Sequence, residues 1–424
     1  MSFYTRGVDW LSRLVRAQQR PLSVDSDAAG DDPAFYQRVE AALGGGHAAE
    51  AERLCKAHIA RGGDNRFAHE RLAHLLLEQG RINDALTHFR AVDVMEGRRD
   101  WTTEAFANER LDIERARRGE PHFRWLDDVR VETAYWTIMQ GDRIYNDDVH
   151  AKNLATSPFV QRRVSADGHR IVASLPPVAR AIDEPCVLVG GDENFSHWLF
   201  RNVLKLSSLD RAGMLYEYPW LINADLKKYQ SEYLALLGQR PERLIKVERN
   251  SVLACRRLLV PALHVSTRAV TEGIGWIRGR FAHLLAGPAT RRIFISRRDG
   301  QRRSLLNEDD VFEALREWDF ERVVPGEMSV VEQIETFASA RCIVAAHGAA
   351  LTNMIFSPPA TAIVEITSTA IEHMNLFRKL ARSTHHEIES IVSADYPEGA
   401  AAAGVNADYR VDVKAVRAAV ARRL

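Results

Sequence analysis

The chain has 424 residues, enough for two or three domains with sizeable cores. Its 57 Lys and Arg balance its 57 Asp and Glu, and zero net charge disfavours a nucleic-acid binder, which usually carries a basic excess. The four cysteines are far apart and form no CxxC pair, which predicts buried thiols in a reducing compartment: Cys55, Cys186, Cys255 and Cys342. The sequence shows neither a signal peptide nor an apolar run of membrane-spanning length, so we expect a cytoplasmic protein.

The first 30 residues are predicted to form a helix and a linker. Residues 8–20 are amphipathic, which favours a helix that packs on the next domain, with a membrane-surface helix as the alternative. Residues 21–33 are rich in Asp, Ala, Gly and Pro, as linkers are. Asp25-Ser26-Asp27 has the DxD pattern of some metal sites, but no apolar strand leads into it, so we interpret it as part of the linker.

An internal repeat follows, and it predicts a helical region over residues 31–120. Five positions recur 34 residues later: Leu43, Gly46, Glu50, Ala51 and Cys55 correspond to Leu77, Gly80, Asp84, Ala85 and Phe89. This pattern resembles the tetratricopeptide repeat, a stack of helix pairs that usually binds proteins or self-associates. We expect a third helix at about 102–118. The alternative is a helical appendage that only covers one face of the next domain.

Residues 121–287 are predicted to form an α/β domain. After short strands and hairpins, an apolar strand at Cys186–Val189 runs into the turn Gly190-Gly191. Asn194 then caps a helix that carries His197 in its first turn, where the helix dipole favours a neutral imidazole suited to general-base chemistry. A purely structural His197 is the alternative. A strand near 218–222, a helix at 225–238, paired strands within 251–261 and a helix at 271–286 complete the domain.

Residues 288–424 are predicted to form a second, doubly wound α/β domain. Its first strand, at 291–296, ends in four arginines, which either clamp a phosphate or form a solvated basic loop: Arg297, Arg298, Arg302 and Arg303. Helices at 308–318 and 330–340 flank a strand at 320–324. A helix near 371–382, surface histidines His385-His386, a last strand and a basic helix at 412–424 end the chain.

Between these elements, residues 341–365 form the most informative stretch of the sequence. A strand at 342–346, the turn His347-Gly348, a short helix at 349–356 and a strand at 362–366 make half of a nucleotide-binding unit. Gly348, Ala349 and Ala350 would let a ligand approach the helix N-terminus, which favours anions. Thr352 and Asn353 add polar groups one turn later. Glu365 stands where an acid would meet a ribose. The alternative is a compact strand-to-helix turn without a ligand.

Several ordered motifs together resemble glycosyltransferase family 61. They are NFSHWL at 194–199, ISRR at 295–298 with Arg303 and Asn307-Glu308, the segment 332–359 that contains HGAALTNMIFSPP, and VEI at 364–366. The resemblance covers about 186–395 and leaves out the helical repeat. It implies a GT-B architecture, in which two Rossmann-like domains face each other across a cleft. It also implies inverting, metal-independent transfer from a nucleotide sugar, with no cofactor beyond that co-substrate.

The resemblance also implies roles for individual residues. Donor-binding residues would be Arg297, Arg303, His347, Gly348, Ala349, Ala350, Thr352, Asn353 and Glu365. His197 matches a family histidine on the acceptor side. Arg201 stands where the family commonly has an acid, so Asp192 or Glu193 are further candidates for the catalytic base.

We therefore expect a glycosyltransferase that moves sugar from a UDP-sugar to a polysaccharide or oligosaccharide acceptor, as in capsule biosynthesis. The predicted domains are 1–30, 31–120, 121–287 and 288–424. A protein partner or a second copy would bind the helical repeat, with at most peripheral membrane contact and no nucleic acid. The alternative is a catalytically degenerate scaffold that acts through its repeats.

Overall fold

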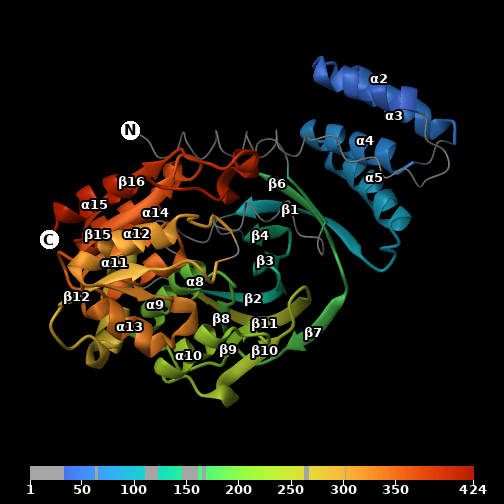
Figure 1. Cartoon of the computed structure of the whole chain (residues 1–424). Helices are drawn as coiled ribbons and strands as arrows, with labels where there is room; N and C mark the ends of the chain where they lie inside the picture. Colours follow the sequence, from blue (N-terminus) through green and yellow to red (C-terminus); the bar gives the residue numbers. More distant parts are fainter. Residues whose placement is uncertain are drawn as a thin grey trace. The chain divides into compact units, whose positions relative to one another are not determined.

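The computed structural model describes residues 33–62, 65–109, 123–145, 161–164, 169–261, 267–300 and 302–424 (Figure 1). The predicted helix at 8–20, the linker and Asp25-Ser26-Asp27 lie outside this range. The chain divides into two compact units, each built from separate segments. Unit 1 contains Met1–Asp112, Arg124–Val187 and Lys246–Val260, and unit 2 contains Ile113–Phe123, Leu188–Ile245 and Pro261–Leu424. None of the helices within the described ranges has the length and apolar character needed to cross a bilayer.

Unit 1 begins with two helix pairs, which confirm the predicted N-terminal helical region: α2 (Pro33–Gly44), α3 (Ala48–Ala60), α4 (Arg66–Glu78) and α5 (Ile82–Met95). The repeated positions play the same part in both pairs. Gly46 and Gly80 adopt left-handed φ values of 75° and 73°, which end the first helix of each pair. Ala51 and Ala85 are fully buried, so the second helix of each pair can pack closely.

The predicted third helix is wrong over its described part, because Thr102–Glu109 form strand β1. This strand pairs antiparallel with β6 (Arg170–Leu175). Buried Asp93 of α5 accepts hydrogen bonds from the hydroxyl groups of Thr103 and Ser174, the latter at 2.6 Å. A strand at 102–109 pairs its backbone with β6 and gives the buried carboxylate of Asp93 a hydrogen-bond donor, whereas a helix would leave both without these partners. These tertiary contacts therefore override the local helix propensity.

The sheet of unit 1 runs in the order β11-β2-β3-β4-β1-β6-β5, with β7 also paired to β11. Its remaining strands are β2 (Phe123–Glu132), β3 (Thr137–Gln140), β4 (Arg143–Tyr145), β5 (Gln161–Val164), β7 (Val178–Ile182) and β11 (Val252–Pro261). The predicted paired strands within 251–261 are wrong, since β11 is one continuous strand. Its first half pairs with β7 and its second half with β8, so the exposed Arg256-Arg257 between two apolar runs marks no turn.

Unit 2 contains three strands in the order β10-β9-β8: β8 (Cys186–Gly190), β9 (Trp220–Asn223) and β10 (Leu244–Val247), with the boundary between units passing through β8 and β10. Short helices follow β8: α8 (Phe195–His197), the π-helix η1 (Trp198–Val203), η2 (Leu204–Leu206) and α9 (Ser207–Arg211). Beyond β9 come α10 (Lys228–Leu236) and η3 (Pro241–Arg243).

Five parallel strands form the second sheet of unit 2, in the order β13-β12-β14-β15-β16. They are β12 (Arg291–Ile295), β13 (Phe320–Val323), β14 (Ala340–Ala346), β15 (Ala362–Ser368) and β16 (Glu387–Ser393). Counted along the chain the order is 2-1-3-4-5, so the direction of winding reverses between β12 and β14. Ligands of such sheets bind at the carboxyl ends of the strands beside this reversal point.

Helices cover both faces of this sheet, as the predicted mixed α/β fold requires. The helices of this part are α11 (Thr267–Arg280), η4 (Ala282–Leu284), α12 (Glu308–Leu315), η5 (Arg316–Trp318), η6 (Pro325–Glu327), α13 (Val330–Ala338), η7 (Ala349–Phe356), η8 (Glu372–Met374), α14 (Leu376–Thr384), η9 (Ala400–Asn406) and α15 (Val413–Ala421). Phe294, Val344 and Val364 share one core with α12 and α15. Their neighbours Ile293 and Ile343 are fully buried as well, so the strands are covered on both faces.

His386 corrects the prediction that His385-His386 lies at the surface. Its side chain is buried, and its Nε2 lies 2.8 Å from the carbonyl oxygen of Met354 in η7. Burial lowers the pKa of His386, which keeps the imidazole neutral inside the protein. The histidine therefore supports the end of η7.

Hydrogen bonds connect the segments 188–245 and 261–424 within unit 2. The indole N–H of Trp276 in α11 donates to Asp210 Oδ2 of α9 at 2.7 Å. The N–H of Val330 at the start of α13 donates to Glu232 Oε2 of α10 at 2.7 Å. In addition, α8 contacts η7 directly. The predicted acceptor-side and donor-side elements therefore lie together in one compact unit.

Candidate active site at the carboxyl ends of β8, β12 and β14

The turns after β12 and β14 meet at the reversal point of the sheet. Arg297 Nη1 donates to the carbonyl oxygen of His347 at 2.8 Å, and Arg297 Nη2 donates to that of Arg302 at 2.9 Å. Gly348 makes this approach feasible, because a Cβ there would clash with Arg297 Nη1. Its φ of −173° suits any residue. Gly348 is therefore required for space, which the guanidinium of Arg297 occupies.

Three arginines gather beside this turn without neutralising partners. Arg297, Arg302 and Arg303 form no ion pair with a carboxylate in the part of the chain that the structure describes, whereas Arg298 pairs with Asp309. Burial, together with the charges of Arg297 and Arg302, lowers the pKa of Arg303. An anion bound here would relieve this like-charge repulsion, and a diphosphate suits guanidinium groups especially well.

Glu308 holds the turn that carries Arg297, a role that sequence reasoning missed. Its buried carboxylate accepts from Ser296 Oγ at 2.6 Å and from the backbone N–H of Arg297 at 2.9 Å. Glu308 is the first residue of α12, where the helix dipole favours a negative charge. The sequence does contain a signal for this role of Glu308: it is an acidic residue at the start of a predicted helix, a few residues after a group of arginines.

The segment after Gly348 has the predicted bounds but is a 3₁₀-helix, with the N–H of Leu351 bonded to the carbonyl of Gly348 at 3.0 Å. Ala349 and Ala350 at its start are half-buried. Thr352 and Asn353 are fully buried, and Asn353 Nδ2 donates to Gln333 of α13 at 2.8 Å. The two alanines therefore lie at the partly accessible start of η7. Thr352 and Asn353 lie in the interior, where Asn353 connects η7 to α13.

His347 and Glu365 form a buried pair across β14 and β15. His347 Nδ1 lies 2.7 Å from Glu365 Oε1, and Ser390 Oγ of β16 donates to Glu365 Oε2 at 2.6 Å. The exposed fractions of His347 and Glu365 are 7 % and 3 %. Both carboxylate oxygens of Glu365 thus have partners within the sheet. The ring of Phe377 in α14 packs edge-on against His347, with 4.9 Å between ring centroids.

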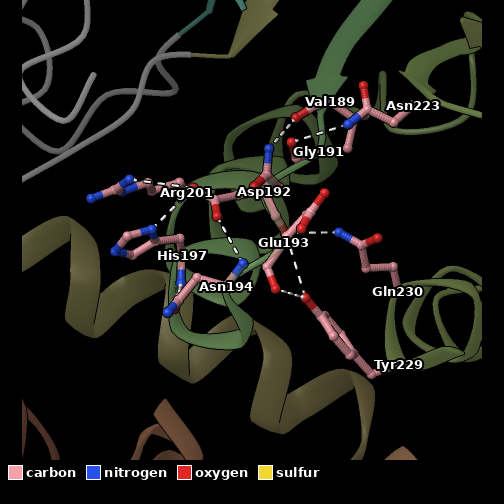
Figure 2. A network of polar contacts seen from close by, with 11 residues as sticks. Val189, Gly191, Asp192, Glu193, Asn194, His197, Arg201, Asn223, Tyr229 and Gln230 are labelled. Carbon is pink, nitrogen blue, oxygen red and sulfur yellow. Dashed lines mark hydrogen bonds and ion pairs between the residues drawn. The ribbon is translucent and has the colours of Figure 1, made fainter. Parts of the chain in front are cut away.

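A second histidine–carboxylate pair follows β8 (Figure 2). His197 Nδ1 lies 3.0 Å from Asp192 Oδ2, and the side chain of His197 is 42 % exposed. The N–H of His197 donates to Asn194 Oδ1 at 3.1 Å, which confirms Asn194 as the helix cap. Because the carboxylate binds the Nδ1 proton, Nε2 is left as an acceptor, the arrangement that a general base needs.

Several contacts fix the charge and position of Asp192. Burial alone would raise the pKa of Asp192, but the hydrogen bond from His197, the backbone N–H of Asn194 and the charge of Arg201 outweigh burial and lower it. Arg201 Nη1 lies 3.5 Å from Asp192 Oδ2. Gln230 of α10 donates to the carbonyl oxygen of Asp192 at 2.8 Å. Asp192 is therefore an ionised, firmly held partner for His197.

Glu193 points elsewhere than its neighbour. Its carboxylate lies 4.0 Å from Lys227 Nζ. Its carbonyl oxygen accepts from Tyr229 Oη at 2.7 Å, as Figure 2 shows. The structure therefore brings Asp192 and His197 together and directs Glu193 toward α10. The turn itself depends on Gly191, because a Cβ there would lie 2.7 Å from Asn223 Nδ2.

A contact between α8 and η7 connects the two parts of the candidate site. His197 lies in α8, which contacts the 3₁₀-helix that follows Gly348. Along the described part of the chain there is no cluster of three or more His, Cys, Asp or Glu side chains arranged to hold a metal ion. Unit 2 thus combines two histidine–carboxylate pairs with three arginines that form no ion pair among the described residues.

Residues 168–364 match the protein family described as Glycosyltransferase 61. The match contains Asp192, His197, Arg297 and Gly348, and it ends one residue before Glu365. The protein is thus a glycosyltransferase. Within that class, the matched segment is that of glycosyltransferase family 61, the family that the sequence motifs predict. The comparison with curated proteins gave no match.

Proposed function

We propose that the protein is an inverting, metal-independent glycosyltransferase that uses a nucleoside diphosphate sugar, a UDP-sugar in the first instance. The acceptor is a polysaccharide or an oligosaccharide, as in capsule biosynthesis. The two α/β parts would work as a GT-B enzyme, with the donor held by the 288–424 part and the acceptor by the 121–287 part. The helical repeat α2–α5 would bind a protein partner or a second copy of the chain.

One observation carries this proposal: the arginine group lies at the reversal point of a parallel sheet. Arg297 follows β12, Gly348 follows β14, and these strands flank the point where ligands of such sheets bind. Arg297, Arg303 and the N–H groups at the start of η7 would hold the diphosphate. The guanidinium groups of Arg297, Arg302 and Arg303 would together supply the positive charge that a bound metal ion supplies in other transferases.

The pair Asp192–His197 would act as the base in this reaction. His197 Nε2 takes the proton of the acceptor hydroxyl while that oxygen attacks the anomeric carbon of the donor sugar. The bond from this carbon to the diphosphate oxygen breaks, and its electron pair leaves with the diphosphate, which Arg297 stabilises. Attack from the side opposite the leaving group inverts the anomeric centre. Asp192 keeps the Nδ1 proton in place and stabilises the imidazolium that forms.

A second candidate function is that of a degenerate transferase that acts as a scaffold. It is favoured by Arg201, which stands where related enzymes commonly have an acid, and by the helix pairs α2–α5. The scaffold would capture a partner through its helices without binding a donor. In such a scaffold, the ion pair between Arg201 and Asp192 would serve only to stabilise the turn that follows β8.

Thermal unfolding of the full chain with a panel of nucleotides and nucleotide sugars, with and without EDTA, separates the two candidates. For the transferase we expect a selective shift with one diphosphate, unchanged by EDTA. Arg297→Ala should abolish that shift and lower sugar transfer by about 100-fold or more, since charge-stabilising groups contribute this much. Arg316→Ala, which changes an exposed residue in η5 directly after α12, is the matched control. If no donor changes the unfolding temperature and no transfer occurs, the scaffold is the better description.

A further inference from the structure

The pair His347–Glu365 resembles Asp192–His197 in composition but differs in its surroundings. His197 keeps a large exposed fraction, whereas His347 and Glu365 are almost completely buried. His347 is also held at three points. Its N–H donates to the carbonyl of Ile366 at 2.7 Å, its carbonyl accepts from Arg297 and its Nδ1 contacts Glu365. Such fixation indicates a side chain whose exact orientation matters.

The hydrogen bonds of Glu365 speak against a direct contact with a ribose. One oxygen lies 2.7 Å from His347 Nδ1, and the other accepts from Ser390 Oγ at 2.6 Å. Its position inside β15, opposite Ala345 of β14, is set by the strand register. Glu365 is also only 3 % exposed, so a ribose hydroxyl would have to enter the packed sheet to reach the remaining lone pairs of the carboxylate.

The contact with Glu365 decides what the other ring nitrogen can do. A carboxylate accepts only, so Nδ1 carries a proton, and Nε2 makes no hydrogen bond with any described residue. A phosphate oxygen is likewise only an acceptor. Nε2 can therefore bind a phosphate only when it too carries a proton, and the adjacent Glu365 carboxylate compensates the resulting imidazolium charge. Arg297 donates to the carbonyl oxygen of His347, so the guanidinium proposed to hold the diphosphate contacts the same residue.

We propose that His347 donates a hydrogen bond from Nε2 to the leaving diphosphate, and that Glu365 is the positioning residue that makes this possible. This inference rests on the proposed function and makes it more specific. Two histidine–carboxylate pairs then have opposite tasks. His197 receives a proton from the acceptor, while His347 keeps its proton and stabilises the negative charge on the departing group. Ser390 holds the carboxylate of Glu365 in register.

The test compares the affinities of UDP, 2′-deoxy-UDP and uridine for the full chain and its variants. For Glu365→Gln we expect UDP affinity to fall by about 10-fold to 100-fold, because hydrogen bonds to charged groups contribute about this much. Uridine affinity should not change, and the preference for UDP over 2′-deoxy-UDP should stay as in the unaltered protein. Ser390→Ala should show a smaller loss of the same kind. Glu389→Gln on the same strand, which removes contacts to Arg422 and Arg423, is the control.

A pair of His347 variants adds a readout that a structural role would not produce. His347→Gln keeps an N–H group near the Nε2 position and should retain more UDP affinity than His347→Phe, which keeps the ring packing alone. Loss of ribose preference in Glu365→Gln, or parallel loss of UDP and uridine binding, would overturn the proposal in favour of a ribose contact. UDP binding equal to that of the unaltered protein in Glu365→Gln would overturn it as well. If the unaltered chain binds no nucleoside diphosphate, the proposed function itself fails.

Discussion

Asp192 is the residue on which the chemistry of His197 depends. Its carboxylate sits in a turn held by Asn194, Gln230 and Arg201, and its pKa is lowered despite burial. The proton on His197 Nδ1 therefore has a permanent acceptor at neutral pH. An uncharged replacement would remove both the preference for this tautomer and the stabilisation of the imidazolium.

We expect Asp192→Asn to lower kcat by about 10²-fold to 10⁴-fold with a small effect on KM, because general-base catalysis contributes about this much. The variant should also lose about 1–3 kcal/mol of unfolding free energy at pH 7, from a hydrogen bond to a charged group. A lowered pKa in the folded state means that this stabilisation is complete above the ordinary pKa of Asp, about 3.9, and is lost as the pH falls through the folded value. Urea unfolding at pH 7 and pH 3 measures the difference.

Glu193→Gln is the matched control for this prediction, since Glu193 is adjacent in sequence and directed toward Lys227. Its activity should stay close to that of the unaltered enzyme. A larger loss of kcat in Glu193→Gln than in Asp192→Asn would assign the base to Glu193.

At the scale of elements, the turn between β14 and η7 depends on the absence of one side chain. A Cβ at Gly348 would clash with Arg297 Nη1, so Gly348→Ala must move the guanidinium or the turn. We expect donor affinity to fall by about 10-fold or more, the amount that one charge-assisted hydrogen bond contributes. Isothermal titration with the donor diphosphate measures it. In the Arg297→Ala background the same glycine change should cost almost nothing further, since the clashing group is gone.

Gly275→Ala in α11 is the control for this double-mutant cycle. A Cβ at Gly275 would meet no atom within 4 Å, so the substitution should leave donor binding unchanged. An alanine within a helix should also stabilise the protein slightly, by about 0.5–1 kcal/mol. Equal losses from Gly348→Ala in the presence and absence of Arg297 would show that the two residues act independently.

The helix pairs of unit 1 contain their own electrostatic clamp. Glu52 of α3 accepts hydrogen bonds from Lys56 at 2.6 Å, from Gln79 at 2.8 Å and from Arg81 at 2.8 Å, the last two lying beyond α4. These hydrogen bonds, that from Lys56 foremost, lower the pKa of Glu52 to about 2. The carboxylate thus joins the first helix pair to the turn between α4 and α5 of the second pair.

Glu52→Gln should weaken this joint in a pH-dependent way. A lowered folded pKa stabilises the folded state above the ordinary pKa of Glu, and the contribution is lost as the pH falls from about 4.5 to about 2. At pH 7 we expect a loss of up to about 1 kcal/mol, in line with partly exposed ion pairs. Amide hydrogen exchange within α3 and α5 at pH 7 and pH 3 measures it. The control is Glu50→Gln, which removes a contact to Arg53 on the same helix. A difference that persists below pH 2 would contradict the assignment.

At the scale of the whole molecule, the sequence predicted elements better than contacts. The strand, turn, helix and strand at 342–366 were predictable because two apolar runs enclose a glycine turn and a Pro-Pro break. The contact between His347 and Glu365 was not, since it depends on the register that places Ala345 beside Glu365. Asp192 and His197 were both candidates, but only the fold of the turn shows that they bind each other.

Two of the wrong predictions share a physical cause. Thr102–Glu109 has a sequence that permits a helix, yet β6 and Asp93 offer partners that only a strand can use. His386 is buried because it forms a hydrogen bond with the carbonyl oxygen of Met354, which is remote from it in the sequence. In both cases the residue that determines the structure lies outside the local segment, so the local sequence pattern cannot predict the contact.

Unit 2 is built from segments that the ribosome translates at different times, with a segment of unit 1 between them. Residues 188–245 leave the ribosome first, the next stretch returns to unit 1 at Lys246–Val260, and only afterwards does Pro261–Leu424 emerge. Until then Glu232 has no Val330 to bind, and α8 has no η7 to cover it. A nascent chain that stops near residue 260 therefore lacks the segment that packs against α8 and α10, and we expect such a chain to aggregate more readily than the complete chain. No single cut along the chain separates the two units.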